Sequence, residues 1–418
     1  MKTGFSKVLE IQSKVFVNFF NKNPLFGTRK QVIVFDLMKR IRTAVADSNS
    51  KVDSSVTENS DAKQKLETDQ NEFSFHADLI RAVGMFLVVL LHSAVEPHPI
   101  VTQPDQAEII RWWTVTTYDA LSHYGVALFV MISGALLLQP WKKEPLWLFL
   151  KKRFNRIALP FFFWTAIYFI YRYAVLNEAI TFTSIINGLE TGAYYHFWFI
   201  YVIMGIYLIT PMLRIFITHA NRNIIKYSLV LWFIATGIIP IIGLFHGNIL
   251  DNRVFLHLEW VGYFILGYYI LKTKIRPLFL YIAFFGGLIY TLIGTYLIQL
   301  TWGGANSWFF VEPISANMIV ISVAMFLLLR NVSATKFQNR FPKINKLVHL
   351  ISQNTLPIYL MHIIVLETFQ NGYLGIQISV NTLTPAWEIP FLAVITIFIC
   401  LGIALGLKKI PILQKMIG

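Results

Sequence analysis

The chain has 418 residues, of which 56% are hydrophobic and only 14% are charged. Soluble domains carry about 25% charged residues, so this composition excludes an ordinary soluble protein and indicates a polytopic membrane protein. The formal net charge of +14 is then explained by membrane topology and by contact with anionic lipid, and it does not indicate nucleic-acid binding. The single cysteine, Cys400, excludes an intrachain disulfide and a cysteine-based metal cluster.

The first part of the chain differs in composition from the rest. Residues 1–45 mix apolar and basic side chains, which is typical of an amphipathic cytoplasmic extension on the membrane surface; an ordered extension without a function is the alternative. Residues 46–74 are polar and are expected to form a disordered linker. We expect a membrane domain over residues 75–410 and a cytoplasmic tail over residues 411–418.

Ten apolar segments approach the length of about 20 residues that a helix needs to cross a bilayer. They cover residues 78–96, 119–139, 157–176, 197–213, 225–245, 256–271, 278–300, 313–329, 350–369 and 388–407. The sequence therefore predicts an all-α, polytopic membrane protein with about ten transmembrane helices.

Lysine and arginine residues are distributed unevenly between the connections of these segments. Nearly all of them fall in one alternate set, and the other set, with its helix ends, holds only Arg111, Arg172 and Arg253. Because cytoplasmic loops are enriched in lysine and arginine, this pattern places both termini in the cytoplasm.

Several common functional motifs are missing from the sequence. It has no P-loop, no dinucleotide-binding glycine motif, no Gly-x-Ser-x-Gly elbow and no internal repeat. None of its ten histidines has the His-Glu-x-x-His spacing of a metal site. We therefore expect neither a primary ATP-driven pump nor a metalloenzyme.

The first apolar segment carries two ionisable residues in its interior, Arg81 and His92, between Asp78 at its start and Glu96 at its end. Eleven steps of a helix return to within about 20° of the starting direction and rise about 16 Å, so both side chains lie on one face. Charged residues are costly in a membrane and usually face the protein interior or a polar cavity. The pair thus indicates a polar path through the protein.

This arginine and histidine pair resembles the signature of the acyltransferase 3 family, whose members are integral membrane acyltransferases that modify bacterial surface glycans. Five further stretches fit that family in the same order, over a region of roughly residues 74–407. They are Gly125–Gly134, Lys151–Pro160, Tyr195–Tyr201, Gly262–Gly267 and Leu356–His362.

The resemblance implies a multi-pass O-acetyltransferase of the bacterial inner (plasma) membrane. It would move an acetyl group from cytoplasmic acetyl-CoA, its acyl donor, to a hydroxyl of a surface polysaccharide or lipid-linked sugar, without a metal or a nucleic-acid partner. A secondary transporter or flippase, with Arg81, His92 and Glu259 as an ion relay, is the alternative. A catalytically idle scaffold is a third hypothesis.

Such a transfer needs a base for the hydroxyl proton or a nucleophile that carries the acyl group, and imidazole suits both roles. His92 is the candidate, with direct transfer and an acyl-His92 intermediate both open. Glu96, one turn further on, is expected to orient the imidazole; the alternative is a solvated residue at the helix end. Arg81 suits a phosphate or a carboxylate of acyl-CoA, and the alternative is an ion pair with Asp78.

Basic residues also precede the third apolar segment. Arg153 and Arg156 match the basic motif of the family and are expected to bind the phosphates of the donor together with Arg81. Lys151 and Lys152 are expected to be membrane anchors, and anchoring is also the alternative for the two arginines.

Other polar or aromatic residues at membrane depth are candidates for an outward cavity that holds the sugar acceptor. For each of them, a buried hydrogen-bonded residue or an interfacial aromatic residue is the alternative. These candidates are His196, Trp198, Glu259, Tyr359 and His362. Ser133 and Gly134 are expected to allow close helix packing.

Overall fold

The structure, a computed structural model, describes residues 71–94, 106–139, 144–246, 259–302, 308–379 and 384–418. The compact unit described below runs from Glu72 to Gly418. The predicted extension over residues 1–45 lies outside the described residues. So does the predicted linker over residues 46–74, except for its last four residues, which begin the first described helix.

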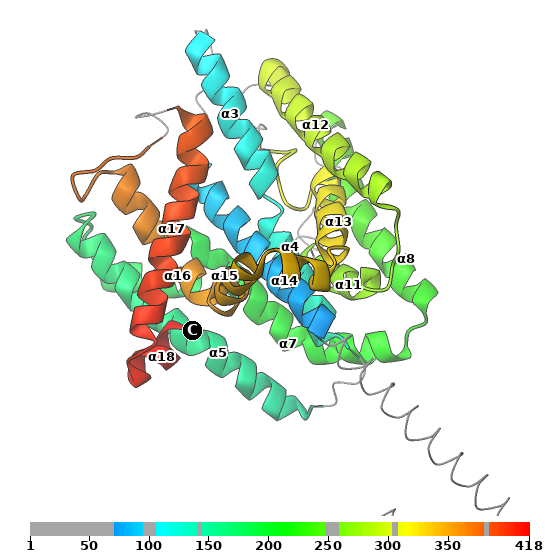
Figure 1. Ribbon diagram of the computed structural model, residues 1–418, viewed down its shortest axis with the longest axis horizontal. Helices are drawn as coiled ribbons and strands as arrows, with labels where there is room; N and C mark the ends of the chain where they lie inside the picture. The colour runs from blue at the N-terminus through cyan, green and yellow to red at the C-terminus, as the bar shows by residue number, and fades with distance from the viewer. Residues whose placement is uncertain (1–70, 95–105, 140–143, 247–258, 303–307, 380–383) are drawn as a thin grey trace, which may run out of the picture. The chain divides into compact units, whose positions relative to one another are not determined.

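All regular elements of the described part are helices (Figure 1). In a bilayer the backbone finds no water to bond, and a helix satisfies its own N–H and C=O groups. In chain order the helices are a first helix (Asn71–Ala94), α3 (Gln106–Ser122), α4 (Gly125–Leu137), α5 (Leu146–Ala174), α6 (Phe182–Glu190), the short η1 (Tyr195–Phe197), α7 (Trp198–His219), α8 (Arg222–Phe233), the π-helical η2 (Ile234–Ile238), α9 (Ile239–His246), α11 (Glu259–Ile270), α12 (Pro277–Trp302), α13 (Ala316–Arg330), α14 (Ala334–Arg340), α15 (Pro342–Gln353), α16 (Thr355–Gln370), α17 (Pro385–Leu407) and α18 (Pro411–Ile417).

The helices confirm the prediction of an all-α polytopic membrane protein. Seven helical segments of the described part are long and apolar enough to cross a membrane, and two bent pairs raise the number to nine. The pairs are α13 with α14, bent by 69°, and α15 with α16, bent by 84°. Each of the ten predicted segments overlaps a described helix, and the sixth corresponds to α11, which has twelve residues.

Several helix starts differ from the predicted segment starts. Helix α5 begins at Leu146 and so includes Arg153 and Arg156, which the sequence placed in the connection before the third segment. Lysine and arginine are good helix formers, and their long side chains reach away from apolar surroundings. Proline stands at or near the first position of α15, α17 and α18, where its missing N–H costs no helical hydrogen bond.

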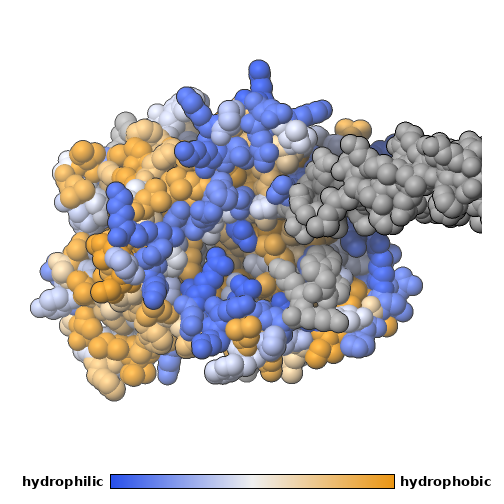
Figure 2. Space-filling model, turned by 60° about the horizontal axis from the view of Figure 1, so that its bottom comes forward, coloured by the Kyte–Doolittle hydropathy of each residue, from blue (hydrophilic) through white to orange (hydrophobic). Residues whose placement is uncertain are grey.

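The first helix lies in the interior of this unit. The most apolar part of Asn71–Ala94 is 67% buried, whereas that of Arg222–Phe245 is only 17% buried. Figure 1 accordingly shows the first helix in blue across the centre, with α8 and α12 at the margin. On the face in Figure 2, hydrophilic side chains gather in the middle and hydrophobic side chains lie around them. Arg81 and His92 thus stand on a helix that packs mainly against protein.

Helices α4 and α11 approach each other closely at two glycines. A Cβ atom added at Gly134 would overlap the carbonyl oxygen of Phe264, and one added at Gly267 would overlap the carbonyl oxygen of Met131. Small residues at such a contact let two membrane helices pack backbone to backbone. The predicted packing role of Gly134 is confirmed, and Ser133 next to it lines the cavity described below.

Candidate active site

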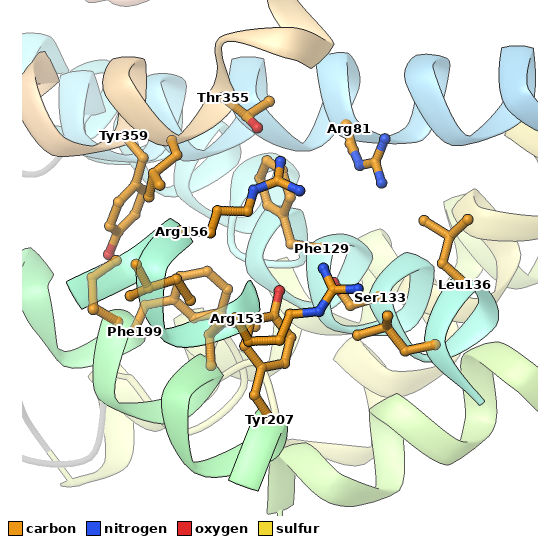
Figure 3. Close-up of a pocket in the computed structure, with 15 residues that line it drawn as sticks. Arg81, Phe129, Ser133, Leu136, Arg153, Arg156, Phe199, Tyr207, Thr355 and Tyr359 are labelled. Carbon is orange, nitrogen blue, oxygen red and sulfur yellow. The ribbon is translucent and has the colours of Figure 1, made fainter. Parts of the chain in front are cut away.

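A cavity of about 280 Å³ lies between the first helix and helices α4, α5, α7 and α16. Arg81 from the first helix and Arg153 and Arg156 from α5 line it, with Tyr207, Thr355 and Tyr359 on its other sides. Figure 3 shows the three guanidinium groups directed into the same space. We refer to this space as the arginine cavity.

One of these arginines, Arg81, has an aspartate nearby. The Nη1 atom of Arg81 lies 3.7 Å from Asp78 Oδ1, so the ion pair left open by the sequence is long. Asp78 has closer partners on α15, because Ser352 Oγ donates to Oδ1 at 2.7 Å and His349 Nδ1 lies 2.6 Å from Oδ2. The aspartate therefore ties α15 to the first helix and offsets the charge of Arg81 only in part.

Arg153 has no ion pair and its buried Nε has no hydrogen-bond partner within the described residues. Its guanidinium carbon lies 5.4 Å from the ring centre of Phe149 and 5.6 Å from that of Tyr207. Aromatic faces stabilise a cation but leave its forked N–H groups available. Together with Arg81 and Arg156, Arg153 gives the cavity an excess of positive charge that suits phosphate groups.

Lys152 behaves differently from the arginines. Its Nζ lies 2.5 Å from Glu144 Oε1, and this hydrogen bond lowers the pKa of the Glu144 carboxyl. Neither Lys151 nor Lys152 lines the arginine cavity. The arginines predicted to bind the donor and the lysines predicted to be anchors therefore occupy different surroundings.

Three histidines from three separate elements meet beside this cavity. The ring centre of His362 on α16 lies 5.1 Å from that of His92 and 5.2 Å from that of His196 in η1. His196 and His362 have no exposed surface. Within the described residues, hydrogen-bond partners are lacking for Nδ1 of His92, for Nε2 of His362 and for both ring nitrogens of His196. We call these residues the histidine cluster.

The cluster is suited to moving a proton. Burial disfavours charge, and two imidazolium rings about 5 Å apart would repel each other, so the resting rings are best described as neutral. The Nδ1 of His362 donates to the carbonyl of Tyr359 at 2.5 Å, which leaves Nε2 with its lone pair.

Among the described residues, no set of His, Cys, Asp and Glu side chains is arranged to hold a metal ion.

Tyr359 connects the two regions. Its side chain lines the arginine cavity, and its ring centre lies 5.6 Å from those of both His196 and His362. Its hydroxyl donates to the carbonyl of His196. The histidine cluster therefore lies behind Tyr359, next to the cavity but not in its lining.

Two other predicted site residues, both described by the structure, are not part of either region. Trp198 packs on Trp260 with ring centres 5.6 Å apart and is 40% exposed. Glu259 begins α11, and its carbonyl accepts a hydrogen bond from Trp232 Nε1 at 2.9 Å. Glu96 lies outside the described residues.

Sequence reasoning missed several residues near the histidine cluster. Tyr195 lies with its ring centre 5.5 Å from that of His92, and its position directly before His196 was a signal for it. Glu367 accepts hydrogen bonds from the hydroxyls of Tyr171 at 2.7 Å and Tyr194 at 2.5 Å. Nothing in the sequence pairs residues this far apart in the chain.

The comparison with known protein families agrees with this geometry. A model of the acyltransferase domain matches residues 76–405, a range that contains the arginine cavity and the histidine cluster. The chain belongs to the acyltransferase 3 family. The resemblance carried by Arg81, His92 and the five further stretches is confirmed, and membership implies an acyl donor and an acceptor. No curated protein and no solved structure matches the chain.

Proposed function

We propose that this family member is an inner-membrane O-acetyltransferase that moves an acetyl group from cytoplasmic acetyl-CoA to a hydroxyl of a surface or lipid-linked glycan. The observation that carries the proposal is the contact, through Tyr359, of a cavity lined by three arginines with a cluster of three histidines. The first region supplies charge for a donor that carries phosphates, and the second supplies groups that accept protons.

The arginine cavity fits the phosphate end of the donor. CoA carries a diphosphate and a 3′-phosphate, and guanidinium groups bind phosphate oxygens in a forked geometry. The lysines and arginines of the connections indicate that this end of the first helix faces the cytoplasm, where acetyl-CoA is made. Arg81 and His92 are about 16 Å apart along the axis of the first helix. With its phosphates near Arg81, the extended arm of CoA would therefore bring the thioester to the histidines.

His92 would act as the base of the reaction. It takes the proton of the acceptor hydroxyl while the oxygen attacks the carbonyl carbon of the thioester. The carbon–sulfur bond then breaks, the acetyl group stays on the acceptor, and the thiolate of CoA takes up the proton that His92 received. In the alternative route the His92 nitrogen attacks first, and the hydroxyl then displaces it from an acyl-imidazole.

His196 would stabilise the charge that develops during transfer. A neutral imidazole has one N–H, and neither ring nitrogen of His196 has a partner within the described residues. A donor of this kind, held in a dry site, stabilises the oxyanion of an acyl-transfer intermediate more strongly than water does. The hydrogen bond from Tyr359 to the His196 backbone fixes the position of that segment.

Membranes that carry the protein and radiolabelled acetyl-CoA test the proposal. We expect label in a glycan or lipid-linked fraction with the wild type, and its loss with His92→Ala and with Arg81→Ala at equal protein levels. His219→Ala is the matched control, because His219 is exposed at the end of α7. Full transfer by His92→Ala would contradict the catalytic role of His92. If the wild-type protein neither binds the donor nor releases acetyl from it, the proposed acetyltransferase function is wrong.

A further inference from the structure

Glu367 and three tyrosines form a polar and aromatic group that the transfer mechanism above does not use. Both carboxylate oxygens of Glu367 are held, because Tyr171 donates to Oε2 at 2.7 Å and Tyr194 donates to Oε1 at 2.5 Å. Tyr194 in turn packs on Tyr195 with ring centres 5.2 Å apart, and Tyr195 reaches His92. A continuous set of contacts therefore runs from Glu367 to the proposed base.

This group lies on the opposite side of the histidines from the arginine cavity. Along α16, Thr355 and Tyr359 line the cavity, His362 belongs to the histidine cluster, and Glu367 comes about 7.5 Å further along the axis. The first helix runs the same way, because it goes from Arg81 in the cavity to His92 in the cluster. Glu367 and Tyr195 thus stand where a second substrate would approach the histidines from beyond the donor.

Tyr195 and Glu367 both have surface or hydrogen-bonding sites that a bound molecule could use. Tyr195 is 57% exposed although its ring touches His92, so one aromatic surface next to the base is open. Glu367 is only partly buried, and an ionised carboxylate has about four lone-pair sites, of which the two tyrosines use two. The remaining sites can accept hydrogen bonds from hydroxyl groups.

The charge of this group selects between classes of acceptor. Arg172, the nearest cation in sequence to Tyr171, is already paired, with Nη2 at 2.6 Å from Glu178 Oε2. The negative charge of Glu367 would repel a carboxylate or phosphate on the bound sugar. It would instead bind sugar hydroxyls through charge-assisted O–H···O⁻ hydrogen bonds.

We propose that Tyr195 and Glu367, with Tyr194 and Tyr171 holding the carboxylate, form the acceptor subsite and that it takes an uncharged sugar ring. The apolar C–H face of the sugar stacks on Tyr195, and its hydroxyls bind Glu367. One hydroxyl then lies next to His92. This inference rests on the proposed function, since it names the acceptor of the same site.

Purified full-length protein in lipid nanodiscs tests the subsite with two synthetic acceptors. These are a lipid-linked hexose and the matching lipid-linked hexuronic acid, each offered with radiolabelled acetyl-CoA. We expect wild-type protein to label the hexose at least tenfold faster at equal concentration. Labelling of the uronic acid in preference, or labelling of neither sugar by protein that binds CoA, would overturn the proposal.

Two substitutions test whether Glu367 and Tyr195 act in binding of the acceptor and not of the donor. Glu367→Gln and Tyr195→Ala are expected to raise the KM for the hexose at least tenfold while CoA affinity and the KM for acetyl-CoA stay within twofold of the wild type. Glu190→Gln and Tyr173→Ala are matched controls, because both residues are exposed. Tyr194→Phe should show a smaller rise of KM in the same direction.

The outcome separates this inference from the proposed function. An unchanged acceptor KM in both Glu367→Gln and Tyr195→Ala contradicts the subsite and leaves acetyl transfer intact. Protein that neither binds CoA nor releases acetyl from acetyl-CoA contradicts the proposed function itself. Circular dichroism and size-exclusion profiles equal to those of the wild type exclude misfolding as the cause of a change in KM.

Discussion

The arginine cavity and the histidine cluster adjoin, yet they are built in opposite ways. The cavity gathers permanent charges, and within the described residues the ion pair of Arg81 with Asp78 is long, at 3.7 Å. The cluster gathers imidazole rings whose free nitrogens can donate or accept a hydrogen bond, in a place where two of the three are fully buried. We propose from this difference that the first region binds and the second reacts, although the first helix and α16 contribute to both.

Substituting the proposed base should produce the largest effect. We expect His92→Ala to lower kcat by about 10²–10⁴-fold, the range that a general base contributes, with CoA affinity within twofold of the wild type. Transfer assays and CoA titrations on the same preparation measure both quantities. Retention of more than a tenth of the wild-type kcat would show that another group is the base, and His219→Ala controls for the loss of a histidine.

Removing one cavity arginine should affect binding and leave the reaction step intact. A hydrogen bond to a charged group contributes about 1.5–3 kcal/mol, so Arg153→Ala or Arg156→Ala should raise the Kd for CoA by roughly 10- to 150-fold. The affinity of the wild type should also fall with salt, because salt screens the attraction. Titration calorimetry measures both effects. Lys151→Ala is the control, and an equal loss in that variant would indicate a general surface charge effect.

The residue between the two regions should give an intermediate result. Tyr359→Phe keeps the ring that separates cavity and cluster but removes the hydroxyl that donates to the His196 carbonyl. A neutral hydrogen bond contributes about 0.5–1.5 kcal/mol, so we expect kcat to fall roughly two- to tenfold. Steady-state kinetics separate this from a binding effect, and a changed donor KM with an unchanged kcat would place the hydroxyl in binding.

The smallest effect is expected at Lys152, outside the cavity. Lys152→Ala removes the partner of Glu144, so the pKa of that carboxyl should rise toward its ordinary value. Because the pKa of Glu144 is lowered in the folded protein, the pair stabilises the fold above the ordinary carboxyl pKa and loses this effect as pH falls. CoA affinity should change less than twofold, and a tenfold loss would move Lys152 into the donor site.

Local patterns in the sequence were enough for the parts of the site that lie on one helix. The spacing of Arg81 and His92 placed them on one face of a membrane helix, and Tyr359 and His362 were both predicted as candidates for a substrate cavity. The apolar segments were enough to predict the helical membrane fold. They did not predict the bend between α15 and α16 at Asn354, although this polar residue and Pro357 after it mark the start of α16.

Contacts between distant segments could not be predicted in this way. His196 meets His362 only because η1 packs against α16, and Glu367 meets Tyr171 and Tyr194 across more than 170 residues of sequence. Trp198 was predicted, as an aromatic residue at membrane depth, to line the same cavity as His196 two residues before it. On a helix that separation points the side chain another way, and it packs on Trp260 instead.

The separation of binding from reaction is tested most directly by titrating CoA into purified wild-type protein, His92→Ala and Arg156→Ala, with acetyl transfer measured on the same samples. The geometry predicts that His92→Ala binds CoA like the wild type without transferring acetyl, and that Arg156→Ala loses CoA affinity but regains much of its transfer rate at high donor concentration. If His92→Ala loses CoA affinity as strongly as Arg156→Ala, or if Arg156→Ala binds CoA normally, the division into a binding cavity and a reacting cluster is wrong.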